Sequence, residues 1–81
     1  MSRSLEDYLK GIYLLKKRKQ YSNKNLAEYL NISPASVSEM IKKLSNENYL
    51  ILEGRNINLT KKGSDIAVNV IRKQRVWEVF L

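Results

Sequence analysis

The sequence contains no cysteine and no histidine, and only one proline and three glycines among its 81 residues. Without cysteine, no disulfide framework can hold the fold together; this suits a reducing compartment, and we expect a cytoplasmic protein. Without histidine or cysteine, and with its glycines isolated, the chain offers no activated nucleophile and no phosphate-binding glycine loop. The adjacent acids Glu6 and Asp7 suit a helix start better than acid–base catalysis. We therefore expect neither an enzyme nor a small-molecule substrate.

Long hydrophobic runs are also missing. No apolar stretch reaches the roughly 18 residues that a membrane span needs, so we expect no membrane partner. The N-terminus becomes charged and helical at once, which is not typical of a signal peptide. The length predicts a single domain, residues 1–81, near the size at which one hydrophobic core just offsets chain entropy.

Positive charge is in excess. Fifteen Lys and Arg residues stand against eight Asp and Glu, for a formal net charge of +7. Such a balance favours polyanionic partners, nucleic acid above all, and the alternative is a generally basic solvated surface.

Hydrophobic residues recur at helical spacing in three successive segments. The first spans residues 5–17 with Ser4 as its cap, and Gly11 marks either close packing by another element or a tolerated weak point. The second spans residues 22–30 with Ser22 as its cap, and the third begins with Ser33 as its cap and Pro34 in its first turn. Because a short connection joins the second and third helices, we predict a helix-turn-helix.

After the third helix the pattern changes to short β-prone runs. We predict strands at 49–53 and 57–59, joined by a three-residue turn at 54–56. A last helix of about 61–81 follows, with Thr60 as its cap. The predicted order is α-α-α-β-β-α, a mainly α fold with a small β-hairpin that is typical of the winged helix-turn-helix.

The stretch "SPASVSEMIKKL", residues 33–44, has an unusual outer face. Four apolar residues at i, i+3, i+4 and i+7 form the predicted buried stripe: Val37, Met40, Ile41 and Leu44. On the opposite side, the first two turns carry mostly side chains one or two heavy atoms long, whereas a solvated face usually carries long charged ones. We infer that a partner comes close to this face.

The major groove of B-DNA is about 12 Å wide and admits one α-helix, with its N-terminal residues toward the base edges. Serine hydroxyls can donate to phosphates or bases, and the Ala35 methyl group can touch a thymine methyl group. Glu39 can accept from cytosine N4, although a carboxylate is repelled by phosphates unless it reads a base. The predicted DNA-binding residues of this helix are Ser33, Ala35, Ser36, Ser38, Glu39, Lys42 and Lys43.

Two other basic segments are candidates for DNA contact. Arg55 and Asn56, at the tip of the predicted hairpin, suit a wing that lies over phosphates or the adjacent minor groove. The alternative is a solvated turn. For the run "KKRK" at 16–19, direct contact competes with charge that simply suits a helix C-terminus.

Four segments occur together in this order: "SLEDYLKGIYLL" (4–15), "NLAEYLNISPASVSEMIKKL" (25–44), "NINLTKKG" (56–63) and "RKQRVWEVFL" (72–81). Together they resemble the N-terminal part of the diphtheria toxin repressor and manganese transport regulator family. This resemblance implies a winged helix that binds a palindromic double-stranded DNA operator as a homodimer. It also implies that divalent manganese or iron, Mn2+ or Fe2+, activates repression.

The resemblance also implies particular site residues. It places DNA contacts on the same helix and hairpin residues named above, except Lys42. It matches two metal ligands, Asp7 and Glu78, but Gln74 stands where the family usually has histidine and Lys10 where some members have glutamate. The remaining ligands of the family come from a helical dimerisation domain beyond residue 81, so the metal site of this chain is expected to be incomplete. Independently of the family, a Gln74–Glu78 pair is a weak chelator, because a neutral amide oxygen binds transition metals poorly.

Alternatives remain open at this stage. The apolar residues Trp77, Phe80 and Leu81 fit a fold-back onto the first helix, a fragment of a longer protein, or pairing with a second copy. The main hypothesis for function is a sequence-specific DNA-binding transcriptional regulator. The alternatives are a nonspecific nucleic-acid-binding module and a protein-interaction module without metal response. An RNA-binding role would make little use of a small-residue helix face, since RNA recognition relies on stacking aromatic residues.

Overall fold

The computed structural model describes residues 5–54 and 56–80, with side chains through residue 73. The elements follow one another as α1 (Leu5–Lys17), α2 (Asn23–Leu30), α3 (Pro34–Asn46), β1 (Leu50–Glu53), β2 (Asn56–Leu59) and α4 (Lys61–Phe80). The predicted α-α-α-β-β-α order and the mainly helical winged fold are confirmed. In the described part of the chain, no helix is both long enough and apolar enough to cross a membrane.

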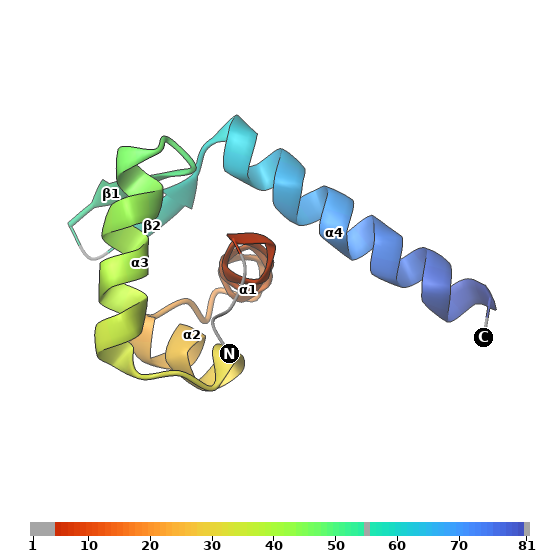
Figure 1. Ribbon diagram of the computed structural model, residues 1–81, viewed down its shortest axis with the longest axis horizontal. Helices are drawn as coiled ribbons and strands as arrows, with labels where there is room; N and C mark the ends of the chain where they lie inside the picture. Colours follow the sequence, from red (N-terminus) through yellow and green to blue (C-terminus); the bar gives the residue numbers. More distant parts are fainter. Residues whose placement is uncertain (1–4, 55, 81) are drawn as a thin grey trace.

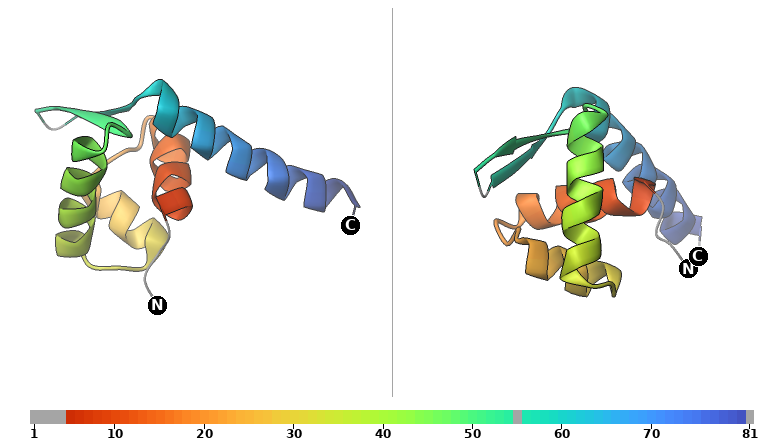
Figure 2. Two further views of the ribbon diagram at one scale, coloured as in Figure 1. Left: turned by 45° about the horizontal axis from the view of Figure 1, so that its top comes forward. Right: turned by 60° about the vertical axis from the view of Figure 1, so that its left-hand side comes forward.

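Helix α1 lies at the centre of this arrangement. Figure 1 shows it end-on, with α2, α3 and the hairpin on one side and α4 on the other. Contacts join α1 to α2 and α4, and α3 to α2 and β1. Helix α4 packs across α1 with its first half and then extends away from the other elements (Figures 1 and 2).

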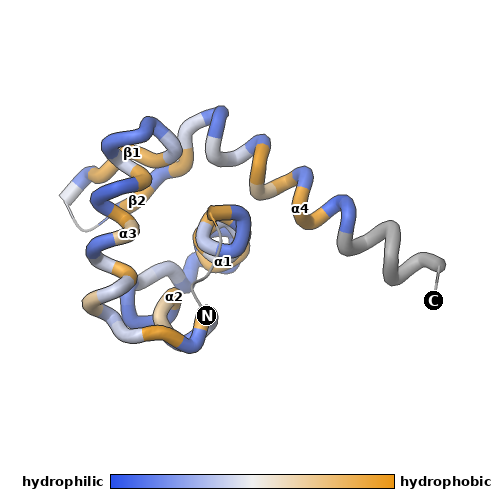
Figure 3. Tube along the Cα trace, viewed as in Figure 1, coloured by the Kyte–Doolittle hydropathy of each residue, from blue (hydrophilic) through white to orange (hydrophobic). Residues whose placement is uncertain are grey.

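The hydrophobic core is made by one stripe from each helix and the inner side of the hairpin. Along α3 and α4, hydrophobic residues alternate with hydrophilic ones, as amphipathic helices require (Figure 3). In α3, the predicted stripe is buried except for Met40, which is half-buried. The fully enclosed side chains include Leu9, Ile12, Leu26, Leu30, Val37, Leu44 and Leu50.

Three of the four predicted helix caps are present as hydrogen bonds. Ser22 Oγ accepts from the backbone N–H of Asn25 at 2.9 Å, which opens α2. Ser33 Oγ accepts in the same way at the start of α3, where Pro34 occupies the first turn. Thr60 Oγ1 accepts from the N–H of Gly63 at 3.2 Å and opens α4. The cap proposed on Ser4 lies outside the described residues.

The hairpin corrects one detail of the sequence prediction. Its antiparallel register pairs Glu53 with Asn56, so only Gly54 and Arg55 separate the strands, and the turn is shorter than the predicted three residues. Gly54 takes the left-handed backbone conformation, with φ +61°, that a tight hairpin needs. Asn56 is therefore the first residue of β2 and not part of the turn.

Gly11 marks close packing and is not merely tolerated. It is buried, and a Cβ atom at this position would lie 2.9 Å from Leu26 Cδ1 and 3.1 Å from the Tyr29 ring. The missing side chain thus allows α2 to approach α1, which the sequence left open as one of two readings.

Candidate nucleic-acid interface

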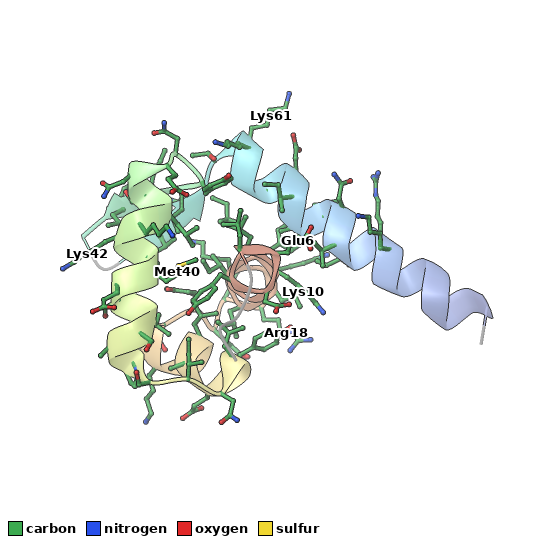
Figure 4. The ribbon with its side chains drawn as sticks, in the orientation of Figure 1. Glu6, Lys10, Arg18, Met40, Lys42 and Lys61 are labelled. Atoms are coloured by element: carbon green, nitrogen blue, oxygen red, sulfur yellow. The ribbon has the colours of Figure 1, made fainter. Side chains whose placement is uncertain are left out.

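The outer face of α3 is open to solvent. Eight residues on this side of the helix are exposed: Ser33, Ala35, Ser36, Ser38, Glu39, Lys42, Lys43 and Asn46. Figure 4 shows Lys42 pointing away from the outer side of α3, whereas Met40 lies on the inner side, toward α1. No other element of the described chain covers this face, so the small side chains of its first two turns are accessible to a partner.

The inner face of α3 fixes the helix in place. Val37 and Leu44 are completely buried, and α3 contacts both α2 and β1. The first turn of α3 contains no acidic residue. The positive end of the helix dipole therefore favours an anion such as phosphate at this end.

Two serines at the start of α3 have different hydrogen-bonding roles. The Ser33 hydroxyl donates to Ser36 Oγ at 2.9 Å, and Ser33 Oγ accepts from the Ser36 backbone N–H at 3.2 Å. Ser33 is therefore occupied by the cap, whereas the hydroxyl proton of Ser36 is left to donate outward. The sequence alone did not separate these two roles.

A groove of about 510 Å³ lies between α3, the hairpin and the segment before α2. It is lined by Tyr21, Ser22, Asn23, Ile41, Leu52, Gly54, Asn56 and Ile57. Asn56 is exposed here, whereas Arg55 lies outside the described residues. The contribution of residues 21–23 was not predicted, because only the folded chain brings them beside the hairpin.

Tyr21 is a neutral hydrogen-bond donor at the edge of this groove. Its hydroxyl donates to Asn23 Oδ1 at 2.9 Å. Burial raises the pKa of Tyr21 well above its usual value, because the phenolate would lose its hydration. The phenol therefore stays protonated under physiological conditions.

The candidate metal ligands do not form a complete site. Asp7 is half-buried on α1, one turn from Lys10, and the side chains of Gln74 and Glu78 lie outside the described residues. Among the residues whose side chains are described, no three His, Cys, Asp or Glu side chains come together. The whole chain also has no histidine and no cysteine, so its side chains offer only oxygen ligands such as carboxylates, which suit Mn2+ better than Fe2+. The described side chains alone do not assemble a metal centre.

Comparison with known proteins gives matches along the whole chain. Residues 1–56 match the family model described as iron dependent repressor, N-terminal DNA binding domain. Two curated relatives carry the name HTH-type transcriptional regulator MntR, from Geobacillus thermodenitrificans and Geobacillus kaustophilus. Each is 38% identical over 80 residues, which cover 96% of this chain and 57% of the relative. The chain thus spans little more than half the length of these relatives, whose names denote regulators of transcription.

Two solved structures share the fold. The manganese regulator SloR matches 100% of this chain with a TM-score of 0.80 and 44% sequence identity. ScaR with bound Zn2+ matches 98% of the chain with a TM-score of 0.81 and 39% identity. The chain covers 39% of the SloR chain and 37% of the ScaR chain, so both proteins continue well beyond the matched region.

Proposed function

This chain belongs to the iron dependent repressor family, by its N-terminal DNA-binding domain, and from that premise we propose that it is a sequence-specific, double-stranded DNA-binding transcriptional regulator. The observation that carries the proposal is the exposed, small-residue face of α3 on a helix whose other face is anchored in the core. Residues 1–81 would act as one winged-helix domain. We also propose that it acts in the cytoplasm, where the DNA of bacterial relatives such as those from Geobacillus lies.

In the proposed complex, α3 enters the major groove with its N-terminal turns toward the bases. Ala35 would contact a thymine methyl group, and Glu39 would accept from cytosine N4. The serines at positions 36 and 38 would donate to phosphates or base edges, and Ser33 would do so on giving up its hydrogen bond to Ser36 Oγ. Lys42 and Lys43, one turn later, would reach the sugar–phosphate backbone or guanine.

The hairpin supplies the second set of proposed contacts. Asn56 is exposed at the start of β2, at the end of the hairpin nearest the turn, and Arg55 precedes it in the sequence. A wing of this kind reaches the minor groove beside the major groove that α3 occupies. The negative potential of a narrow minor groove attracts arginine.

A homodimer on a palindromic operator is the natural assembly for this interface, because two-fold symmetry in the protein matches two-fold symmetry in the site. Helix α4 extends away from the other elements, and the relatives continue beyond the matched region (Figure 1). We propose that α4 leads into a dimerisation domain in such longer proteins.

Regulation of DNA binding by Mn2+ or Fe2+ is suggested only by relatives such as the manganese regulator SloR. In this chain, Asp7 and Glu78 would be the ligands. Two carboxylates are too few ligands for a complete site, so further donors would be needed. We therefore propose no role for the metal in DNA binding by this chain.

The test is a binding titration against a library of palindromic duplexes, with and without Mn2+, at several salt concentrations. We expect a preferred site and a log–log salt slope of about −0.9 for each phosphate neutralised. Ala35→Leu should weaken the preferred site by about 1 to 3 kcal/mol, because a larger side chain keeps α3 from the bases, and should change random DNA little. Lys43→Ala should weaken all duplexes alike.

Equal losses on preferred and random DNA for both variants would contradict base reading by α3. A chain that binds duplexes without preference would instead be a nonspecific nucleic-acid-binding module. If the chain bound no duplex at low salt, the protein-interaction hypothesis would replace the proposed function.

A further inference from the structure

A run of four basic residues at the end of α1 has no part in the interface proposed above. We call Lys16, Lys17, Arg18 and Lys19 the α1 basic tip. Lys16 is half-buried and the other three are exposed. Residues 8–27 contain Lys10, these four and Lys24, but no Asp or Glu. The fold brings one carboxylate near this end of α1, because Glu28 lines a pocket with Leu15 and Gln20, so positive charge stays in excess at the tip.

The chain that leaves the α1 basic tip runs directly to the hairpin side of α3. Residues 21–23 line the same groove as Gly54 and Asn56 of the hairpin. In the right-hand view of Figure 2, the connection from α1 to α2 lies beneath the hairpin, on the same side of α3. The connection that follows the tip therefore lies on the side of α3 toward which the wing reaches. Within the tip, Lys17 also lines a pocket against α4, and Figure 4 shows Arg18 on the side of α1 away from α3.

Lys19, the last residue of the α1 basic tip, has a backbone conformation that is more stable for glycine. Helix α1 ends with hydrogen bonds from the Lys19 N–H to the Lys16 carbonyl at 3.0 Å and from the Gln20 N–H to the Leu15 carbonyl at 2.9 Å. In this closing motif, the residue at the Lys19 position takes a left-handed conformation and is usually glycine. Lys19 has φ +57° and follows three other cations directly. The chain thus keeps a fourth positive charge at a position where glycine would relieve both strain and repulsion, a pattern that points to function.

We propose that the α1 basic tip binds phosphates of the duplex that flanks each operator half-site on the wing side. This inference rests on the proposed function. If α3 occupies a major groove and the hairpin reaches the next minor groove, the phosphates next along the duplex come toward the tip. Contacts to these phosphates carry no sequence information, but they lengthen the footprint and steepen the salt dependence of binding.

The experiment compares two duplexes that contain the same preferred palindrome. One ends at the palindrome, and the other carries ten further base pairs of random sequence on each side. In the triple variant Lys17→Gln/Arg18→Gln/Lys19→Gln, we expect about tenfold weaker binding to the flanked duplex and a salt slope shallower by about 2 to 3. Binding to the short duplex should stay within about twofold of the unchanged chain, because the tip has no phosphate to reach there.

Two further variants separate a DNA contact from a general effect. Lys61→Gln/Lys73→Gln removes two positive charges from exposed positions on α4 and should affect both duplexes to the same small extent. Lys19→Gly should raise the thermal unfolding midpoint and still weaken binding to the flanked duplex. A folding defect cannot produce that combination.

Equal losses on both duplexes would overturn the inference, because the tip would then act within the half-site or through the fold. Unchanged binding to the flanked duplex would overturn it too, since the tip would be only a solvated helix end. Both results differ from failure of the proposed function, in which the unchanged chain binds neither duplex.

Discussion

Two glycines decide how closely neighbouring elements approach each other. A Cβ atom on Gly63, in the first turn of α4, would collide with the backbone carbonyl oxygen of Tyr49. A Cβ atom on Gly11 would meet side-chain atoms of Leu26 and Tyr29, which can move. The two positions look alike in the sequence, but only Gly63 is pressed against backbone.

We predict that Gly63→Ala lowers the free energy of unfolding by about 2 to 3 kcal/mol, because the start of α4 must shift away from Tyr49. Gly11→Ala should stay within about 1 kcal/mol of the unchanged chain, because the gain in helix propensity offsets the displacement of side-chain ends. Urea unfolding of both variants measures the difference. The reverse ranking would show that α4 has more freedom here than the structure indicates.

Tyr21 gives a prediction about pH. Its pKa is raised in the folded state above the ordinary value of 10.0, so on unfolding above about pH 10 the phenol loses a proton that the folded chain keeps. Stability should therefore fall as pH rises from 9 to 11, and fall less steeply in Tyr21→Phe. Urea unfolding at the two pH values checks this.

Tyr29→Phe, at a more exposed tyrosine, is the matched control for the pH experiment. It controls for the loss of a tyrosine hydroxyl group as such. If Tyr21→Phe and Tyr29→Phe show the same pH dependence, the Tyr21 phenol is not the group responsible.

At the scale of helices and strands, most boundaries could be predicted because their signals are local. The apolar spacing of α3, its Ser33 cap and its Pro34 are all contained within a few residues, and the structure has them as expected. The predicted length of the hairpin turn was wrong by one residue. Both Gly54 and Asn56 can adopt positive φ, and pairing between the strands, which depends on the core, selected Gly54.

The candidate site likewise has one part that could be predicted from local sequence and another that could not. The outer face of α3 could be predicted, since one helix carries it. The groove against the hairpin could not, because residues 21–23 reach it only after α1, α2 and the hairpin have packed together. The metal ligand proposed on Glu78 remains a prediction, since its side chain lies outside the described residues.

Thr60 joins two elements through one hydroxyl group. It accepts from the Gly63 N–H and donates to the carbonyl oxygen of Asn48 at 2.7 Å. We predict that Thr60→Val, which keeps the shape but removes both hydrogen bonds, lowers the free energy of unfolding by about 1 to 2 kcal/mol. Thr60→Ser should retain most of the stability. Equal urea midpoints for the two variants would show that the hydroxyl contributes little.

At the scale of the whole molecule, the proposed homodimer predicts a fixed distance between half-sites. Two α3 helices related by two-fold symmetry enter successive major grooves about 34 to 36 Å apart, or multiples of that distance. Inserting five base pairs between half-sites turns one of them to the opposite side of the duplex and should reduce affinity to that of a single half-site. Ten inserted base pairs should restore part of the loss. Affinity that is independent of spacing would mean that the chain binds as a monomer.

The first turn of α4 is fastened to the segment between α3 and β1. Besides the Thr60 hydrogen bond, Lys62 Nζ donates to the carbonyl oxygen of Glu47 at 3.3 Å and lies 4.2 Å from the centre of the Tyr49 ring. A helix of 20 residues is about 30 Å long, so α4 acts as a lever arm on this joint. In the proposed homodimer, a displacement of its distal end would be passed through α1 and this first turn to α3 and the hairpin, and would change the distance between the two α3 helices on DNA.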